Sequence, residues 1–417
     1  MSPGRRRALM RLGLPARFAP LAGLAGLAGP WLATPAQAQA QAEAQAKAKA
    51  EADGVQRGRV LTFPRDHGAH PETRTEWWYA TGWLGQAEQA THGFQVTFFR
   101  SRTGLAPGNA SRFAARQLLF AHAAVTVLGN APGPSARPGP HLQLHLHDQR
   151  IARWSGDPAA ALGAAQLGGG AVHLQGWSLH DTGSSWQATV QGRDFAIDLQ
   201  LARTQPLLLQ GEAGYSRKGP DAGQASHYVS EPQLATRGSI TVQGRKLSTA
   251  AETTTTTSTA TTTATAGRAW MDHEWSDDIL HPQAVGWDWI GINLFDGSAL
   301  TAFVLRRADG SALWAGGSWR TAGHAAQAFV HDGVRFSPGR RWRSPSTAAN
   351  YPVEWAIETP VGRYTLRALM DAQELDGRGS TGTVYWEGLS ELLDGQARRV
   401  GLGYLEMTGY AARLVVG

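Results

Sequence analysis

The 417-residue chain contains no cysteine. This absence excludes disulfide bonds, cysteine-bound zinc, a thiol nucleophile and a lipid-modified cysteine. Several catalytic motifs are missing as well. The chain has no Gly-x-Ser-x-Gly elbow of a serine hydrolase, no second histidine four residues after His273 to complete a helical zinc motif, and no glycine-rich phosphate loop between a strand and a helix. We therefore predict neither a metal site nor a cofactor.

Acidic residues are absent from the first 38 positions, which hold five of the 39 Lys and Arg residues. Residues 5–7 are arginines, residues 18–33 are mostly apolar, and residues 36–38 offer a small-x-small cleavage pattern. We predict a cleaved export signal at 1–38, since Pro20 and Pro30 interrupt the apolar run and disfavour a membrane anchor. Residues 6–10 resemble a twin-arginine signal. The expected location is periplasmic or secreted.

The chain after residue 38 has nearly balanced charge. It holds 34 basic and 33 acidic residues, so the net charge falls from +6 to +1. Such a balance does not support a nucleic-acid partner. Because no other apolar run is long enough to cross a bilayer, we expect a protein that does not span the membrane.

Short strand patterns with frequent turns make up most of this remainder. The whole chain has 50 glycines and 21 prolines, most of them after residue 38, where they punctuate segments of alternating apolar residues, and no long amphipathic helix is evident. These features predict an all-β protein built from antiparallel barrels or sandwiches, with one barrel in each half. The expected division is a low-complexity spacer at 39–54, an N-terminal barrel at 55–247, a flexible Thr-rich insertion at 248–266 and a C-terminal barrel at 267–417.

Tryptophan and titratable residues gather in three short stretches of the chain. Seven of the 16 tryptophans lie within residues 75–83, 269–275 and 286–289. A purely structural core avoids carboxylates, so aromatic walls with isolated acids indicate an apolar pocket with a few polar groups. Alternatively, the acids bind indole N–H groups at the barrel ends. The candidate ligand-binding residues are Glu76, Trp77, Trp78, Tyr79, Trp270, Trp275, Trp287, Asp288 and Trp289.

Strand alternation separates some of these neighbours in space. If residues 270–275 form a strand, Asp272 and Glu274 point away from His273. On a second strand, Asp288 points away from both Trp287 and Trp289, and we expect the two indoles to face the pocket. If the protein is an enzyme, its candidate catalytic residues are His273, Glu274 and Asp272.

Four motifs in order resemble the AttH-like, lipocalin-related proteins. These motifs are residues 63–79, 225–230, 270–275, and 385–388 with 403–410. The family is related to the carotenoid 1,2-hydratases (hydroxyneurosporene synthases) and is often labelled "predicted secreted hydrolase". The resemblance covers roughly residues 60–415 and implies two lipocalin-like antiparallel β-barrel domains.

The resemblance also implies a chemistry and a site. A hydratase of this type protonates the terminal C=C of an isoprenoid and then adds water. Its His-x-Trp element matches residues 273–275, whereas its Tyr-x-Asp element, which supplies the acid, should fall near residues 300–305. No carboxylate occurs there, so Asp272, Glu274 or Asp288 would have to replace the missing acid.

Three functions follow from these observations. The first is an exported lipocalin-like protein that binds a long apolar ligand, an isoprenoid or a lipid, without converting it. The second is a carotenoid 1,2-hydratase-type enzyme. The third is an accessory to envelope lipid transport with a transport partner. A carboxyl group buried beside the indoles, in one shared cavity, would favour the enzyme, and carboxyl groups turned to solvent would favour the carrier.

Overall fold

The computed structural model describes residues 54–85, 90–104, 115–128, 143–154, 163–248, 267–278 and 280–414. The predicted export signal, the spacer up to residue 53 and the Thr-rich insertion from residue 249 lie outside the described residues. Within them the protein is all-β, as predicted, with two short 3-10 helices, η1 (Arg65–His67) and η2 (His331–Gly333), and no α-helix. No helix of the described residues is long and apolar enough to cross a membrane.

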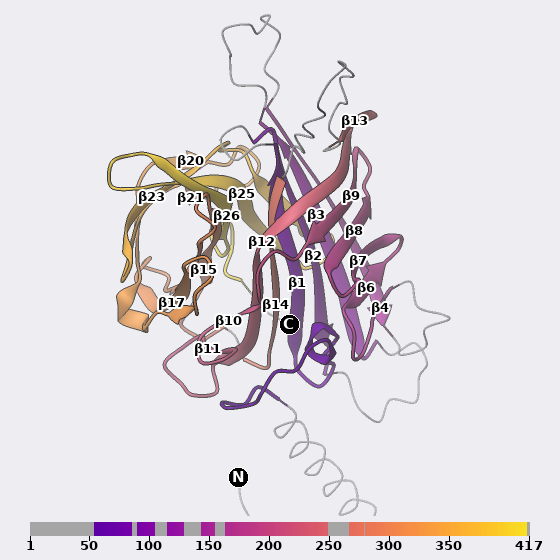
Figure 1. Ribbon diagram of the computed structural model, residues 1–417, viewed down its shortest axis with the longest axis horizontal. Helices are drawn as coiled ribbons and strands as arrows, with labels where there is room; N and C mark the ends of the chain where they lie inside the picture. The colour runs from indigo at the N-terminus through magenta and orange to yellow at the C-terminus, as the bar shows by residue number, and fades with distance from the viewer. Residues whose placement is uncertain are drawn as a thin grey trace, which may run out of the picture. The chain divides into compact units, whose positions relative to one another are not determined.

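Fourteen strands form the first antiparallel sheet, and its main path has the order β4-β3-β2-β1-β14-β12-β9-β8-β7-β6-β5 (Figure 1). Strands β10, β11 and β13 pair with β12 outside this path. The bounds are β1 Thr75–Leu84, β2 His92–Arg102, β3 Gln117–Val127, β4 Leu144–Trp154, β5 Gly163–Ala165, β6 Ala171–Leu174, β7 Trp177–Asp181, β8 Ser185–Gln191, β9 Phe195–Ala202, β10 Leu208–Leu209, β11 Tyr215–Arg217, β12 Ala225–Val242, β13 Arg245–Ser248 and β14 Gly267–Ser276.

Ten strands form the second antiparallel sheet, whose main path is β18-β17-β16-β15-β26-β25-β23-β22-β19, with β24 paired to β25. A separate hairpin joins β20 to β21. The bounds are β15 Gly286–Leu294, β16 Ala299–Arg306, β17 Ala312–Arg320, β18 Gln327–Ala328, β19 Arg335–Pro338, β20 Arg341–Arg343, β21 Asn350–Pro352, β22 Glu354–Thr359, β23 Gly362–Ala368, β24 Glu374–Gly377, β25 Thr383–Leu393 and β26 Arg399–Met407.

Strand β14 belongs to the first sheet, although the sequence interpretation placed residues 267–276 at the start of the C-terminal barrel. It lies between β1 and β12 and pairs with both (Figure 1). The passage from one sheet to the other therefore follows Ser276. The Thr-rich segment before Gly267 therefore does not separate the two sheets, since β13 before it and β14 after it both belong to the first sheet. Composition did not show this, because strand pairing depends on partners far away in the sequence. The division into two domains otherwise stays a prediction.

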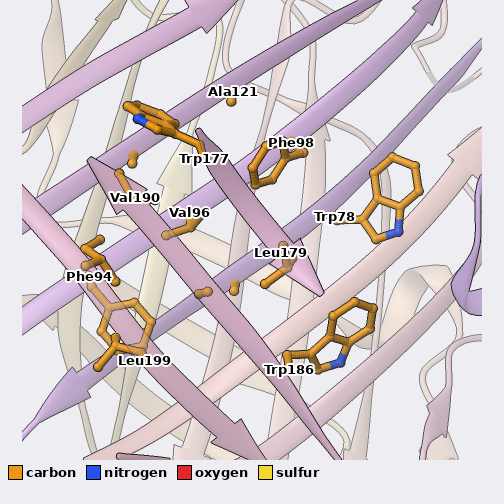
Figure 2. Packing of buried hydrophobic residues seen from close by; sticks show 14 of the residues in the cluster. Trp78, Phe94, Val96, Phe98, Ala121, Trp177, Leu179, Trp186, Val190 and Leu199 are labelled. Atoms are coloured by element: carbon orange, nitrogen blue, oxygen red, sulfur yellow. The ribbon is translucent and has the colours of Figure 1, made fainter. Parts of the chain in front are cut away.

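The first sheet encloses a core that side chains fill. Trp78, Phe98, Trp177 and Trp186 pack together there with aliphatic residues of β2, β3, β8 and β9 (Figure 2). A second core lies against the second sheet, around Ile290, Ile292 and Trp386. A third apolar cluster contains residues of both sheets, including Tyr79, Trp289 and Tyr404.

Strand β1 is covered on both faces, which explains its density of large aromatic side chains. Trp78 and Ala80 belong to the core of the first sheet, whereas Tyr79 and Trp83 belong to the cluster shared with the second sheet. A strand buried on both faces has no solvent side to populate with polar residues, so its sequence does not alternate between apolar and polar. The density of Trp near residues 75–83 is therefore partly a packing requirement.

Candidate functional site

A cavity of about 550 Å³ has walls from both sheets. The first sheet supplies residues of β1, β2, β3, β12 and β14, and the second supplies residues of β15, β16, β25 and β26. The walls are mainly aromatic and aliphatic, and include Trp77, Tyr79, Trp287, Trp289 and Phe303. Five acidic residues occur among those that line the cavity: Glu76, Asp272, Glu274, Glu387 and Glu406. A largely apolar cavity with a few convergent polar groups is typical of a ligand site.

Strand register explains how the side chains meet. In the first sheet Tyr79 on β1 lies opposite Asp272 on β14, and Asp272 lies opposite Ser230 on β12. In the second sheet Trp289 on β15 lies opposite Glu406 on β26, which lies opposite Glu387 on β25. Directly opposed residues of antiparallel strands share a face. Each sheet thus presents a row of aromatic and acidic side chains to the cavity.

Asp272 is a buried carboxyl group held by three donors. Its oxygens accept hydrogen bonds from Ser230 Oγ at 2.6 Å, Tyr228 Oη at 2.7 Å and Trp270 Nε1 at 2.6 Å. Burial raises the pKa of Asp272 to about 7, because these neutral donors only partly offset the loss of hydration. Trp289 Nε1 of the second sheet donates to the same Tyr228 hydroxyl at 3.0 Å. The acid is therefore linked to both sheets and can hold or release a proton near neutral pH.

Glu274 has a cationic partner. Its Oε1 lies 2.9 Å from Lys218 Nζ, and Ser226 Oγ donates to the same oxygen. Both charged side chains are about 6% exposed, and the ammonium lies over the rings of Tyr228 and Phe303, at 4.5 and 4.2 Å from their centroids. Cation–π attraction stabilises such a partly desolvated ammonium. This ion pair gives the cavity one fixed polar position.

Glu387 and Glu406 face each other on β25 and β26 without a cation. No ion pair joins either carboxyl group to a Lys or Arg of the described residues. Burial raises the pKa of Glu387 well above its usual range, and the neighbouring charge of Glu406 raises it further. Burial also raises the pKa of Glu406. Two like charges on adjacent strands cannot both ionise at low cost, so the pair retains a proton near neutral pH.

His122 links the two sheets beside this cavity. On β3, its Nδ1 lies 2.7 Å from Tyr385 Oη on β25, and its Nε2 lies 2.7 Å from Ser380 Oγ. Burial lowers the pKa of His122 to about 3, so the ring is neutral at physiological pH. His122 therefore positions Tyr385 and does not add positive charge to the cavity.

A second polar cluster lies on the opposite face of β1 and β14. Glu76 Oε1 is 2.8 Å from His70 Nδ1 and 2.9 Å from His273 Nε2, and Glu76 Oε2 accepts from Arg100 Nε at 2.7 Å. Burial alone would raise the pKa of Glu76, but the Arg100 charge and the two histidines outweigh it and hold that pKa well below its usual range. His70 stacks on Trp275 with ring centroids 3.7 Å apart.

This Glu76 network contains a metal-type ligand set that the sequence did not suggest. Ligand atoms of His70, Glu76 and His273 lie within 4.8 Å of one another. Glu76 already accepts from both histidines and pairs with the Arg100 guanidinium, so a divalent ion would have to overcome a buried positive charge. The arrangement fits an ion-pair network better than a metal centre, and the absence of a metal stays a prediction.

A family model described as AttH-like matches residues 54–410. The chain belongs to the AttH-like family. The crystal structure of a candidate AttH from Nitrosomonas europaea is 40% identical, with a TM-score of 0.70, over 86% of this chain and 99% of that one. Kievitone hydratase from Nectria haematococca has the same fold at 15% identity and a TM-score of 0.58, over 87% and 96% of the two chains. No curated protein matches the chain.

The structure places only some of the predicted site residues at the cavity. Glu76, Trp77, Tyr79, Asp272, Glu274, Trp287 and Trp289 line it. As predicted from alternation, Asp288 points away from its two neighbours: it pairs with Arg306 at 2.7 Å and accepts from Tyr410. The expectation that Asp288 contacts a ligand in this cavity is therefore wrong.

The remaining predicted residues need similar correction. Trp78 lies in the core of the first sheet (Figure 2). Its Nε1 donates to the His67 carbonyl. His273 and Trp275 lie with Glu76 and His70 on the face away from Asp272 and Glu274, so His273 cannot act with those two acids. Trp270 does not line the cavity, but it donates a hydrogen bond to Asp272 and packs edge-on against Trp289, with ring centroids 6.4 Å apart. The carboxylate of Glu76 is committed to its own network.

The predicted site residues did not include four polar residues of the cavity: Glu387, Glu406, Lys218 and Tyr228. Glu387 and Glu406 lie within motifs that resemble the family's C-terminal close, and alternation from Tyr385 would have placed Glu387 on the same strand face. Tyr228 lies within the matched motif at residues 225–230. Lys218 offered no comparable signal, because a single Lys between β11 and β12 has no pattern around it. Residues 300–305 contain no acid, whereas Glu387 of β25 and Glu406 of β26 line the cavity.

Proposed function

We propose that this AttH-like protein is a hydro-lyase-type enzyme that adds water to, or removes it from, an unsaturated and mostly apolar substrate. The observation that carries the proposal is the pair Glu387 and Glu406, buried in an aromatic cavity built by both sheets. Carboxyl groups in a shared cavity favour an enzyme, whereas a carrier needs only apolar walls. The fold shared with kievitone hydratase is compatible with this activity.

The cavity residues can carry out such a reaction with Glu387 first donating a proton and later regaining one. The protonated carboxyl group of Glu387 transfers its proton to one alkene carbon, leaving a carboxylate and a positive charge on the other carbon. The faces of Trp287, Trp289 and Tyr79 stabilise that cation. Water adds to the cationic carbon, and the proton that it loses returns to Glu387. Glu274, fixed by Lys218, is the candidate group to orient the water.

The volume of the cavity limits the size of the substrate. A volume of about 550 Å³ suits a molecule of roughly drug size, or one end of a longer chain. An isoprenoid or other lipid with a terminal C=C fits this description if only its reactive end enters. We propose that the protein acts outside the cytoplasm, because residues 1–38 resemble an export signal. Participation in envelope lipid transport stays a prediction.

Turnover by the purified protein tests the proposal. Residues 39–417 are incubated with an isoprenoid-containing lipid extract in isotope-labelled water, and mass spectrometry follows both bound and converted species. We expect a product that contains one labelled oxygen, lost in Glu387→Gln and retained in Glu358→Gln, whose side chain is 48% exposed and away from the cavity. A lipid that co-purifies unchanged with all three proteins would instead make this a binding protein.

A further inference from the structure

The cavity has more acidic than basic side chains free to act on a ligand. The cations in its walls are already paired: Lys218 with Glu274 at 2.9 Å, Arg100 with Glu76 at 2.7 Å, and Arg102 with Asp277 at 3.9 Å. Within the described part of the chain, Glu387 and Glu406 have no such counterion. A ligand that brings a positive charge would supply the missing partner.

Two buried polar atoms in the same walls lack hydrogen bonds. Glu387 Oε1 and Tyr79 Oη make none of normal geometry with the described residues, although Glu387 is 2% and Tyr79 5% exposed and the two side chains interact with each other. An unpaired polar atom at such depth costs about 1–3 kcal/mol. A ligand with an N–H donor would satisfy Glu387. Burial raises the pKa of Glu387 and the Tyr79 hydroxyl lowers it in part, so these two side chains from different sheets belong to one subsite of the cavity.

Aromatic faces surround this subsite. Tyr79 and Trp289 pack edge to face, with centroids 5.4 Å apart and planes at 88°. Trp289 is directly opposite Glu406 and, on its other side, opposite Phe303. Aromatic rings beside carboxyl groups form the type of cage that binds alkylammonium ions.

We propose that the cavity binds organic ammonium ions in preference to neutral molecules of the same shape. The inference rests on the cavity being the ligand site of the proposed function, and it extends that function by naming a ligand class. Such an ion imitates the carbocation of the proposed reaction and would inhibit it competitively. Because the acidic pair holds a proton in the empty site, binding of the ion releases one.

A pair of isosteric probes tests the preference directly. N,N-dimethylbenzylammonium and isobutylbenzene differ at the central atom, which is N⁺–H in one and C–H in the other. Titration of the protein, followed by tryptophan fluorescence and calorimetry at pH 7, should give at least about tenfold tighter binding of the ammonium ion. In Glu387→Gln this ratio should fall close to one with the affinity for isobutylbenzene unchanged, whereas Glu358→Gln should keep it.

A second measurement needs only the unaltered protein. Calorimetry in two buffers of different ionisation enthalpy should show that the ammonium ion, but not isobutylbenzene, releases a proton on binding. Equal affinities for the two probes, no binding of the ammonium ion, or binding without proton release would each overturn the inference. Hydration of a neutral lipid without a preference for the ammonium ion would contradict this inference but not the proposed hydro-lyase activity. A preference for the ammonium ion without any turnover would support this inference and contradict the proposed hydro-lyase activity.

Discussion

Replacing Glu76 with glutamine removes the negative charge at the centre of the buried network on β1. Glu76 and Arg100 are 2.7 Å apart, and both side chains are 0% exposed. In the variant the guanidinium keeps its bonds to Gln117, Thr73 and the His70 carbonyl but loses its counterion. Breaking one side of a buried ion pair costs about 3–5 kcal/mol, a large share of the roughly 5–15 kcal/mol that stabilises a domain.

Equilibrium unfolding in urea at pH 7 measures this loss. We expect Glu76→Gln to lower the free energy of unfolding by about 3–5 kcal/mol, and the double variant Glu76→Gln with Arg100→Met to recover most of it, because no unpaired charge then remains. Glu212→Gln is the control: Glu212 pairs with Arg57 at 2.8 Å, but the two side chains are 58% and 72% exposed. Its cost should stay below about 1 kcal/mol.

The pH dependence of stability provides an independent test of the Glu76–Arg100 ion pair. The pKa of Glu76 is held below its usual range, so its contribution to stability is present above the unfolded-state pKa of about 4.3 and is lost as pH falls through the folded-state pKa. The difference between the unaltered protein and Glu76→Gln should therefore shrink in acid. If Glu76→Gln costs no more than Glu212→Gln at pH 7, the buried charge pair is not what stabilises this region.

Two further predictions concern the cavity. The pKa of Asp272 is raised to about 7, so the folded state binds more protons than the unfolded state between about pH 4 and 7, and stability should fall as pH rises through this window; Asp272→Asn should flatten that slope in urea titrations, and an unchanged slope would contradict the assignment. A Cβ at Gly291 would overlap the Trp289 indole, so Gly291→Ala should cost about 1–3 kcal/mol and shift tryptophan emission. Gly395→Ala, with open space around its Cβ, should stay within about 0.5 kcal/mol, and equal effects of the two substitutions would refute the packing argument.

Local patterns predicted much of this molecule. Most expected strands are present because alternation and turn residues act within a few positions of each other. The same rule separated His273 from Asp272 and Glu274, and Asp288 from its neighbouring indoles, and the structure confirms both separations. Ordered motifs were enough to recognise the AttH-like family.

Alternation tells which residues share a face but not what covers that face. Trp78 and Tyr79 are adjacent, and only the packing of the second sheet against one side of β1 makes Tyr79 a cavity residue and Trp78 a core residue. The sequence interpretation assigned residues of every Trp-rich segment to ligand binding, because composition carries no information on which face of a strand a residue occupies.

The sequence by itself determined the strands, the family and the alternation of acids with indoles, since these depend on neighbours along the chain. Only the tertiary structure decided where those acids act. β1 and β14 pair across almost 200 residues, and β25 and β26 bring Glu387 and Glu406 to a cavity that neither half of the chain builds alone. The protonation state of the carboxyl groups in this cavity depends on their burial between the two sheets and not on their neighbours in the sequence.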